Sequence, residues 1–250
     1  MRSRQLAFAL ARVHTRDRLI PGLERALVRF FARQARQTAR RFLNTPDDGK
    51  SAKRLETKAA DPNSLIPESD SRILLRAVIP RVQAMALASS ALTAELLNLQ
   101  PMTANSVGLQ RILTEAGDRI TRINDATRTA VQRVLDQGVS DRLTDREIAQ
   151  RLESTVRQTY RNRASAIART EMGLADQQAA HERYASGGVT HVLIFDGAEC
   201  GWDGHDDGDL ANGSVRTLAE AESVLLSHPN CTRASAPHVM PDGTPISNPA

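Results

Sequence analysis

The sequence predicts an α+β fold that is mostly α, with long N-terminal and central helices followed by a small C-terminal α+β module that has a Cys/His-containing loop. Apolar residues recur at helical spacing through most of residues 21–185. Aromatic residues make up only 3% of the chain, so Ala, Leu, Val and Ile must supply most of the core. This composition favours helices packed closely through small residues over a β-sandwich. The first strand-like run, VTHVLIF at 189–195, comes only after Gly187 and Gly188.

The first predicted helix, 21–43, is amphipathic. Its apolar face carries Leu23, Ala26, Leu27, Phe30 and Phe31, and a different face carries Arg25, Arg29, Arg33, Arg36 and Arg40. One interpretation is a solvated face over an ordinary core contact. The other is a contact with a polyanion or an acidic protein, because each Arg can neutralise a phosphate. A membrane-surface helix is less favoured, since no lipidation signal accompanies it.

The chain is predicted to have five segments. They are a basic helical arm (1–45), a linker or mobile loop (46–70), a helical domain (71–186), a small α+β Cys/His module (187–239) and a disordered tail (240–250). The linker is rich in Pro, Asp, Ser and Lys and has few large apolar residues.

Within the helical domain, we expect a helix over 73–99 that is interrupted at Pro80, and a long helix that ends at Gly138. A capping box, Thr144 to Glu147, opens a short helix to about residue 152. A further helix should run over 155–185, where Gly187 and Gly188 stop it.

On that last helix, Glu171 is a carboxylate in a stripe of small apolar residues. A buried carboxylate needs a partner, because an unpaired buried charge costs several kcal/mol. We expect a structural ion pair with an arginine; a catalytic role is the alternative, and no second catalytic group lies in evident register.

The C-terminal module should contain a strand at 189–195, an Asp/Gly-rich loop at 196–216 and a second strand near 232–239. Between the loop and that strand, Thr217 and Glu220 form a second capping box, which starts a short helix.

Charge is distributed unevenly along the chain. Residues 1–60 carry 15 Lys/Arg against five Asp/Glu, a local net charge of +10, and the other residues total −6. A basic N-terminal segment joined to an acidic remainder indicates a protein that contacts two different partners. No segment approaches the 18 or more apolar residues of a membrane span. With two cysteines we expect no disulfide framework, and we expect the protein to work in a cytoplasm.

Candidate metal ligands come in two pairs in the C-terminal module: Cys200 with His205, and His228 with Cys231. Two thiolates and two imidazoles suit a tetrahedral zinc ion. The alternative is that the cysteines are small buried residues and the histidines hydrogen-bonded loop residues. We expect the stretch CGWDGHDDGD to build a rigid loop with Trp202 as its apolar anchor.

No motif of hydrolytic chemistry is present: G-x-S-x-G, H-E-x-x-H and G-x-x-x-x-G-K-[ST] are all absent. We therefore expect no enzymatic activity and assign no catalytic residue. A metal-dependent nuclease that uses His205, His228 and nearby Asp residues stays the enzyme alternative, and a DNA-binding protein acting during packaging or delivery is another.

The order of the C-terminal motifs resembles a known family. IARTE at 167–171 is followed by a helix ending in Gly-Gly, a strand, DGAECGW at 196–202, HDDGD at 205–209, ANGSVRT at 211–217 and HPNC at 228–231. This resembles the phage Mu F-like minor head proteins, or head morphogenesis proteins, of phages that infect actinobacteria. The resemblance covers about residues 105–240. Family members often carry C-x-x-C early and HPxCxC late, whereas here Asp203 and Arg233 replace cysteines, which excludes a four-thiolate site.

The resemblance implies a minor capsid protein of a tailed bacteriophage, built in during assembly in the host cytoplasm and located in the virion inside the head near the portal. Its implied partners are the portal protein, capsid or scaffold proteins and genomic DNA, and no membrane.

Overall fold

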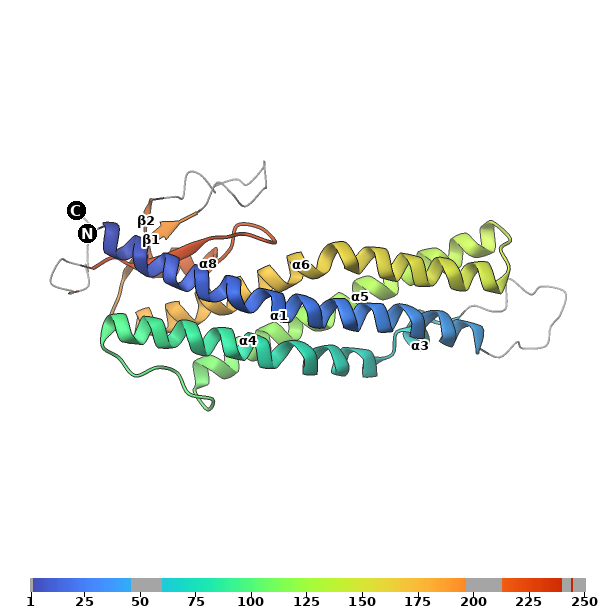
Figure 1. Cartoon of the computed structure of the whole chain (residues 1–250), viewed down its shortest axis with the longest axis horizontal. Coiled ribbons are helices and arrows are strands. Elements are labelled where there is room, and N and C mark those ends of the chain that lie inside the picture. Colours follow the sequence, from blue (N-terminus) through green and yellow to red (C-terminus); the bar gives the residue numbers. More distant parts are fainter. Residues whose placement is uncertain (1, 46–59, 197–212, 240–243, 245–250) are drawn as a thin grey trace. The chain divides into compact units, whose positions relative to one another are not determined.

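The computed structural model describes residues 2–45, 60–196, 213–239 and 244. Four long helices dominate it: α1 (Arg2–Leu43), α4 (Glu68–Leu97), α5 (Val107–Ser140) and α6 (Asp145–Ser186). The described structure also has two short helices, α3 (Pro62–Leu65) and α8 (Leu218–Ser223), and three strands, β1 (His191–Phe195), β2 (Val215–Thr217) and β3 (Ala234–Pro237) (Figure 1). The predicted class, α+β and mostly α, is confirmed.

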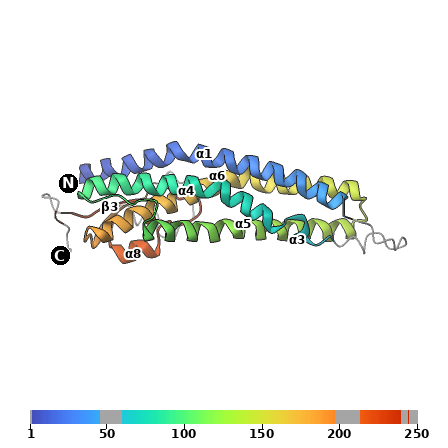
Figure 2. The same cartoon turned by 90° about the horizontal axis from the view of Figure 1, so that it is seen from below.

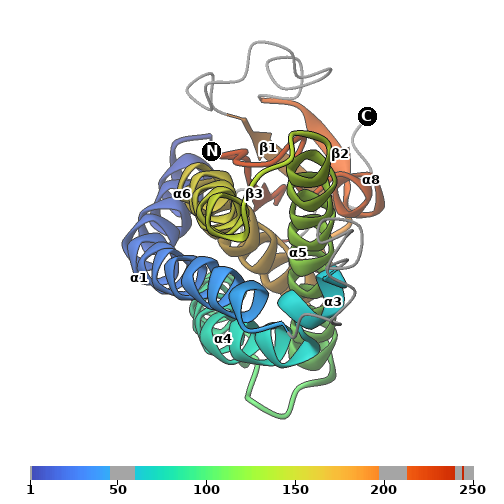
Figure 3. The same ribbon diagram turned by 90° about the vertical axis from the view of Figure 1, so that its right-hand side faces the viewer.

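The chain divides into two compact units, and each long helix contributes a segment to both. The first unit comprises residues 1–23, 79–116 and 165–250 and contains the sheet; the second comprises 24–78 and 117–164. Within each unit, segments of all four long helices lie side by side (Figures 2 and 3). The five segments predicted from the sequence stay a prediction.

Three predicted helix boundaries are wrong. Helix α1 begins at Arg2 and has Pro21 inside it, and α4 continues through Pro80. A proline removes one backbone hydrogen bond, but packing can hold the helix together; Val78 and Val82 on either side of Pro80 are both fully buried. Helix α6 is continuous where two helices were expected, because no Gly or Pro lies at residues 152–155, where the break was predicted.

The predicted linker over 46–70 is partly helical. Asp61 caps α3 by accepting a hydrogen bond from the Asn63 backbone N–H, and Leu65 and Ile66 are fully buried. Helix α4 then begins at Glu68. Two buried apolar residues give this stretch a core contact that a solvated linker lacks. Residues 46–59 lie outside the described part of the chain, as does the predicted tail except for residue 244.

The small sheet has the strand order β2-β1-β3, and both pairs are antiparallel. The predicted strands near 189–195 and 232–239 are confirmed as β1 and β3. We expected residues 196–216 to form one loop, but its end belongs to strand β2. The three residues of β2 are too few to show an alternating pattern in the sequence. The predicted helix stop is also confirmed, since Gly188 has a φ of 72° in the left-handed region.

Both predicted capping boxes are present. The Glu147 backbone N–H donates to Thr144 Oγ1 and the Thr144 backbone N–H donates to Glu147 Oε2 (2.7 Å). Thr217 and Glu220 make the same reciprocal pair at the start of α8. The hydroxyl and then the backbone N–H of Thr144 and of Thr217 donate to the carboxylates of Glu147 and Glu220, and these bonds lower the pKa of both glutamates. Each helix start is therefore determined by residues three positions apart.

In the first unit, the sheet packs on the end of α6 through one apolar cluster. It comprises Ala180, Tyr184, Val189, Val192, Ile194 and Ala221, with Phe8, Leu97 and Leu218 against it. Because β1 is buried along most of its length, its apolar run lacks the alternation of a half-exposed strand.

The second unit has a polar layer within its helical core. Gln34 of α1 donates to Asn124 of α5 (3.0 Å), and Asn124 donates to Ser71 of α4 (2.8 Å). Arg41 forms a bidentate pair with Asp70 (2.9 and 3.0 Å). Such paired polar groups fix which helix faces meet, because any slip would leave them buried without partners.

By length and composition, α4 could cross a membrane, although the sequence analysis expected no segment to be apolar enough for a membrane span. One such helix is weak evidence, because core helices pass the same test. In its most apolar window 39% of residues are buried. Its Ser89 is buried and donates to the Asp176 backbone carbonyl (2.8 Å). This contact with another helix of the first unit is typical of a helix packed against protein.

Candidate functional site

Five arginines on one face of α1 form what we call the arginine stripe. They are Arg25, Arg29, Arg33, Arg36 and Arg40, and all five are exposed. At 3.6 residues per turn they fall within an arc of about 80° and extend about 22 Å along the helix. The expected segregation is confirmed, since Leu23, Leu27 and Phe31 of the same helix are buried.

The arginine stripe differs from several other arginines of the second unit in having no acidic partner among the described residues. Among the residues described, none of its members forms an ion pair, whereas Arg128, Arg151 and Arg157 pair with Asp125, Asp141 and Glu153. Over residues 24–43, six arginines face a single acid, Glu24, which lies outside the arc of the stripe.

The net charge follows the two units. The second unit contains 22 Lys/Arg and 14 Asp/Glu, a net charge of +8, and the first contains 11 and 15, a net charge of −4. These totals are counted from the sequence, and six of the 15 acids of the first unit lie outside the described residues. A surface of one sign in a unit of the same sign attracts anions at longer range than an isolated side chain would.

The first unit has a buried polar network centred on Arg12 of α1. The guanidinium Nε donates to Asp176 Oδ1 (2.9 Å), Nη1 to Tyr184 Oη (3.0 Å) and the Ser235 carbonyl (2.7 Å), and Nη2 to the Asp176 carbonyl (3.2 Å) and Gln177 Oε1 (3.0 Å). These five bonds match the five N–H donors of a guanidinium. Burial alone would lower the pKa of Arg12, but the charge of Asp176 raises it, and the net change is upward.

Three side chains of α1 hold the outer edge of β3, and we call them the β3 clamp. Because the His238 backbone N–H bonds to the His191 carbonyl, the carbonyls of residues 233, 235 and 237 point away from β1. The β3 clamp donates to all three: Gln5 to Pro237 (2.8 Å), Arg12 to Ser235 (2.7 Å) and Arg16 to Arg233 (3.3 Å). An edge strand that would otherwise offer unpaired carbonyls is thus covered.

Beside this network, His181 Nε2 lies 2.9 Å from Ser235 Oγ. Ser235 Oγ donates to Gln177 Oε1 (2.9 Å), so it accepts from His181, and the proton sits on Nε2. The arrangement is the reverse of a serine nucleophile that gives its proton to histidine. Burial lowers the pKa of His181 to about 3 and raises that of Tyr184 to about 12. Both side chains are therefore neutral, and they hold the fold together.

Of the four predicted metal ligands, His228 and Cys231 lie in the described chain, while Cys200 and His205 do not, and neither does Trp202. Among the residues that the structure describes, no group of three or more His, Cys, Asp or Glu side chains is placed to hold a metal ion. The zinc site and the role of Trp202 stay predictions.

Cys231 is a free, buried cysteine that precedes β3 and lies beside Asp196, the residue after β1. Its Sγ donates to Asp196 Oδ1 (3.7 Å) and accepts from the Arg233 backbone N–H (3.4 Å). The Arg233 guanidinium in turn pairs with Asp196 Oδ2 (2.6 Å), and both side chains are 1% exposed. Arg233 thus forms a buried ion pair, and Cys231 lies beside that pair.

His228 belongs to a turn that is tied to α6. The Cys231 backbone N–H bonds to the His228 carbonyl (3.2 Å), and Asn230 has a φ of 72°. The Asn230 backbone N–H donates to Thr170 Oγ1 (2.9 Å). The motif IARTE on α6 and the motif HPNC, 60 residues apart in sequence, therefore meet in the first unit.

Glu171 is buried, with 5% of its surface exposed, as expected for a carboxylate in an apolar stripe. Its predicted ion pair with an arginine stays a prediction.

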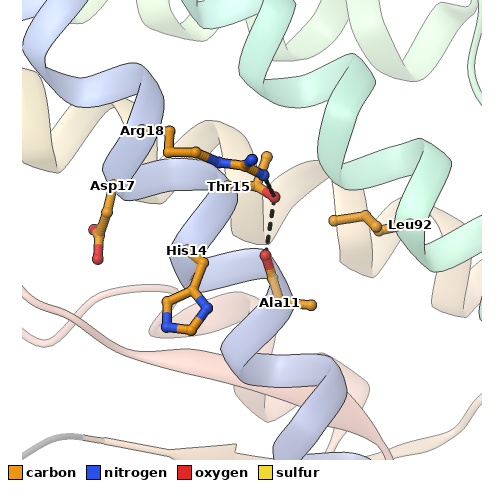
Figure 4. Close-up of a pocket in the computed structure, with 6 residues that line it drawn as sticks. All are labelled: Ala11, His14, Thr15, Asp17, Arg18 and Leu92. Atoms are coloured by element: carbon orange, nitrogen blue, oxygen red, sulfur yellow. Dashed lines mark hydrogen bonds between the residues drawn. The ribbon is translucent and has the colours of Figure 1, made fainter.

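An open hollow lies on the first unit, between α1 and α4 (Figure 4). Its volume is 670 Å³, and it is lined by Ala11, His14, Thr15, Asp17, Arg18 and Leu92. Thr15 Oγ1 donates to the Ala11 carbonyl (2.9 Å), and Arg18 donates to Thr15 Oγ1 (3.3 Å). Because these polar groups bond to their own helix and do not converge on a common point, the hollow lacks the arrangement of a catalytic site.

The sequence-based prediction missed Arg12, Asp176 and the rest of the buried network. Arg12 lies before the predicted helix 21–43 and was given no role. Extending the helical spacing backward from Leu23 would have found it, because the same face carries Ile20, Arg16, Arg12, Ala9 and Gln5, all of them buried. A basic residue on a core-facing position predicts a buried acidic partner.

Comparisons of this chain with protein-family models, curated proteins and solved structures find no match.

Proposed function

We propose that this protein is a minor head protein of a tailed bacteriophage, of the phage Mu F-like head morphogenesis type. It would be built into the head during assembly, lie inside the capsid near the portal, and contact the portal protein and packaged DNA. It would act by joining unlike surfaces, without catalysing a reaction.

The observation that carries the proposal is the contact among three of its motifs. The resemblance depends on the order of several short motifs, each weak alone. In the first unit, Thr170 of IARTE bonds to Asn230 of HPNC, and Asp196 of DGAECGW bonds to Cys231 of HPNC. Motifs that meet around one point have a reason to occur together, since each positions the next. This supports the view that the motif set belongs to one structural unit.

The charge of the two units also supports a bridging role. A unit of net charge +8 and a unit of net charge −4 suit partners of opposite sign. The arginine stripe gives the basic unit a defined contact surface.

The test is the protein content of phage particles. Purified virions and procapsids from a host that carries the gene are analysed by mass spectrometry, and an affinity tag on the portal protein is used to recover bound partners. We expect this chain in both particles and in the portal fraction. Its absence from virions and procapsids alike would refute the proposal, and its presence in particles without portal recovery would remove the portal contact.

A further inference from the structure

We propose that the arginine stripe on α1 binds the phosphate backbone of double-stranded nucleic acid without reading its base sequence. The inference deepens the proposed function and rests on it for its setting, since a head protein meets packaged DNA.

The first step is that the stripe is available for a partner. Its five guanidinium groups are exposed, and among the described residues they pair with no carboxylate. The sixth arginine of the same segment, Arg41, is the contrast: it turns inward, is 29% exposed, and forms an ion pair with Asp70. The fold therefore uses Arg41 for its own stability and leaves the other five free of such structural use.

The second step is the charge spacing. The five arginines are spaced by four, four, three and four residues, which places a positive charge about every 6 Å over about 22 Å of helix. A DNA duplex carries one phosphate per about 3.4 Å of axis on each strand, or about six per strand over the same length. Five guanidinium groups therefore meet a similar number of phosphates along one strand.

The third step is the absence of protein-type anchors on this face. Protein interfaces depend on buried aromatic or aliphatic side chains, ringed by polar ones. Between Arg25 and Arg40 the arc contains only arginines, Phe30 and Phe31 are buried in the core, and the exposed Leu43 beyond Arg40 is a single apolar residue on the arc. A polar, strongly positive surface is typical of protein–DNA interfaces.

The fourth step is that the arc has no side chain that would recognise adenine, while its arginines can contact phosphate or guanine, a choice that the duplex of unrelated sequence tests below. Asn and Gln recognise adenine in the major groove, and the described α1 face has none within the arc of the stripe. Gln34 is on the opposite side, where it is buried and bonds to Asn124. Phosphate contacts alone position a protein on DNA and carry no sequence information.

The experiment compares the full-length chain with two variants that each lose five positive charges from the second unit. In the stripe variant, Arg25, Arg29, Arg33, Arg36 and Arg40 are changed to Gln. In the control variant, five exposed arginines elsewhere, Arg72, Arg76, Arg122, Arg133 and Arg146, are changed to Gln. Binding of a fluorescent 30-base-pair duplex of mixed sequence is measured by anisotropy from 50 to 200 mM NaCl.

For the unmodified chain, five phosphate contacts predict a slope of log K against log [salt] of about −4.5, and hence about 500-fold weaker binding at 200 mM than at 50 mM salt. The stripe variant should lose most of its affinity and most of that slope. The control variant should keep the slope within about one contact of the original. A second duplex of unrelated sequence should bind equally well.

Far-UV circular dichroism shows whether the variants fold. If the stripe variant does not, a single change, Arg33→Gln, still tests the inference, because it should reduce the slope by about 0.9. Equal losses in both five-fold variants, or no binding by the unmodified chain, would overturn the inference. So would binding to poly-L-glutamate but not to DNA, which would identify an acidic protein as the partner. Absence from virions with DNA binding intact would sink only the proposed function.

Discussion

Replacing Arg12 with Met is the sharpest test of how the first unit is held together. Most acceptors of Arg12 keep a second donor: the Ser235 carbonyl keeps Tyr184 Oη (2.9 Å), and the Asp176 carbonyl keeps Ser89 Oγ (2.8 Å). The Asp176 carboxylate, which is 0% exposed, loses its ion-pair partner. Breaking a buried pair in this way costs about 3–5 kcal/mol, a large share of the stability of an ordinary domain.

Urea unfolding followed by circular dichroism measures this loss as a shift of the midpoint at constant slope. Arg18→Met is the matched control, since Arg18 lies on the exposed face of the same helix and, among the residues described, bonds only to Thr15; it should change stability by less than about 0.5 kcal/mol. The double variant Arg12→Met/Asp176→Leu should recover much of the loss, because it removes the stranded charge. If Arg12→Met cost no more than Arg18→Met, the buried network would not hold α1 to the sheet.

Three further predictions concern pH, capping and metal. His181 has a pKa of about 3 in the folded state and an ordinary value of 6.5, so the unfolded chain binds more protons between these two pH values. The free energy of unfolding is therefore complete above pH 6.5 and about 2 kcal/mol lower at pH 5. His181→Gln should remove this pH dependence. Thr217→Ala removes the cap of α8 and should cost about 1 kcal/mol in the same unfolding assay, most of it restored by Thr217→Ser. The Cys/His hypothesis predicts zinc in the purified protein by elemental analysis, lost on Cys231→Ala and on His205→Ala; a metal-free protein would leave Cys231 as a buried thiol only.

The helices and the module that follows them could be predicted because their signals are local. Gly188, the capping boxes at Thr144 and Thr217, and the apolar face from Leu23 to Phe31 each act within one or two turns. The proline positions misled the prediction for the opposite reason. Pro21 and Pro80 carry the local signal of a break, and packing of the residues around them overrides it.

The candidate surface was also within reach of the sequence, because an arginine every three or four residues defines a helix face without any tertiary information. The buried pairs were not. Arg12 and Asp176 are 164 residues apart, and Asp196 and Arg233 are 37 apart. No spacing rule links residues so distant, so a charged residue destined for the core looks like any surface charge until its partner is known.

The β3 clamp has a consequence for biosynthesis. Gln5, Arg12 and Arg16 bond to partners 232, 223 and 217 positions later in the chain. During translation, the side chains of Gln5, Arg12 and Arg16 on α1 therefore stay hydrated until β3 has left the ribosome. Removing the first 23 residues would expose the outer edge of β3 with unpaired carbonyl groups. We therefore expect the truncated chain to self-associate rather than fold as a smaller monomer.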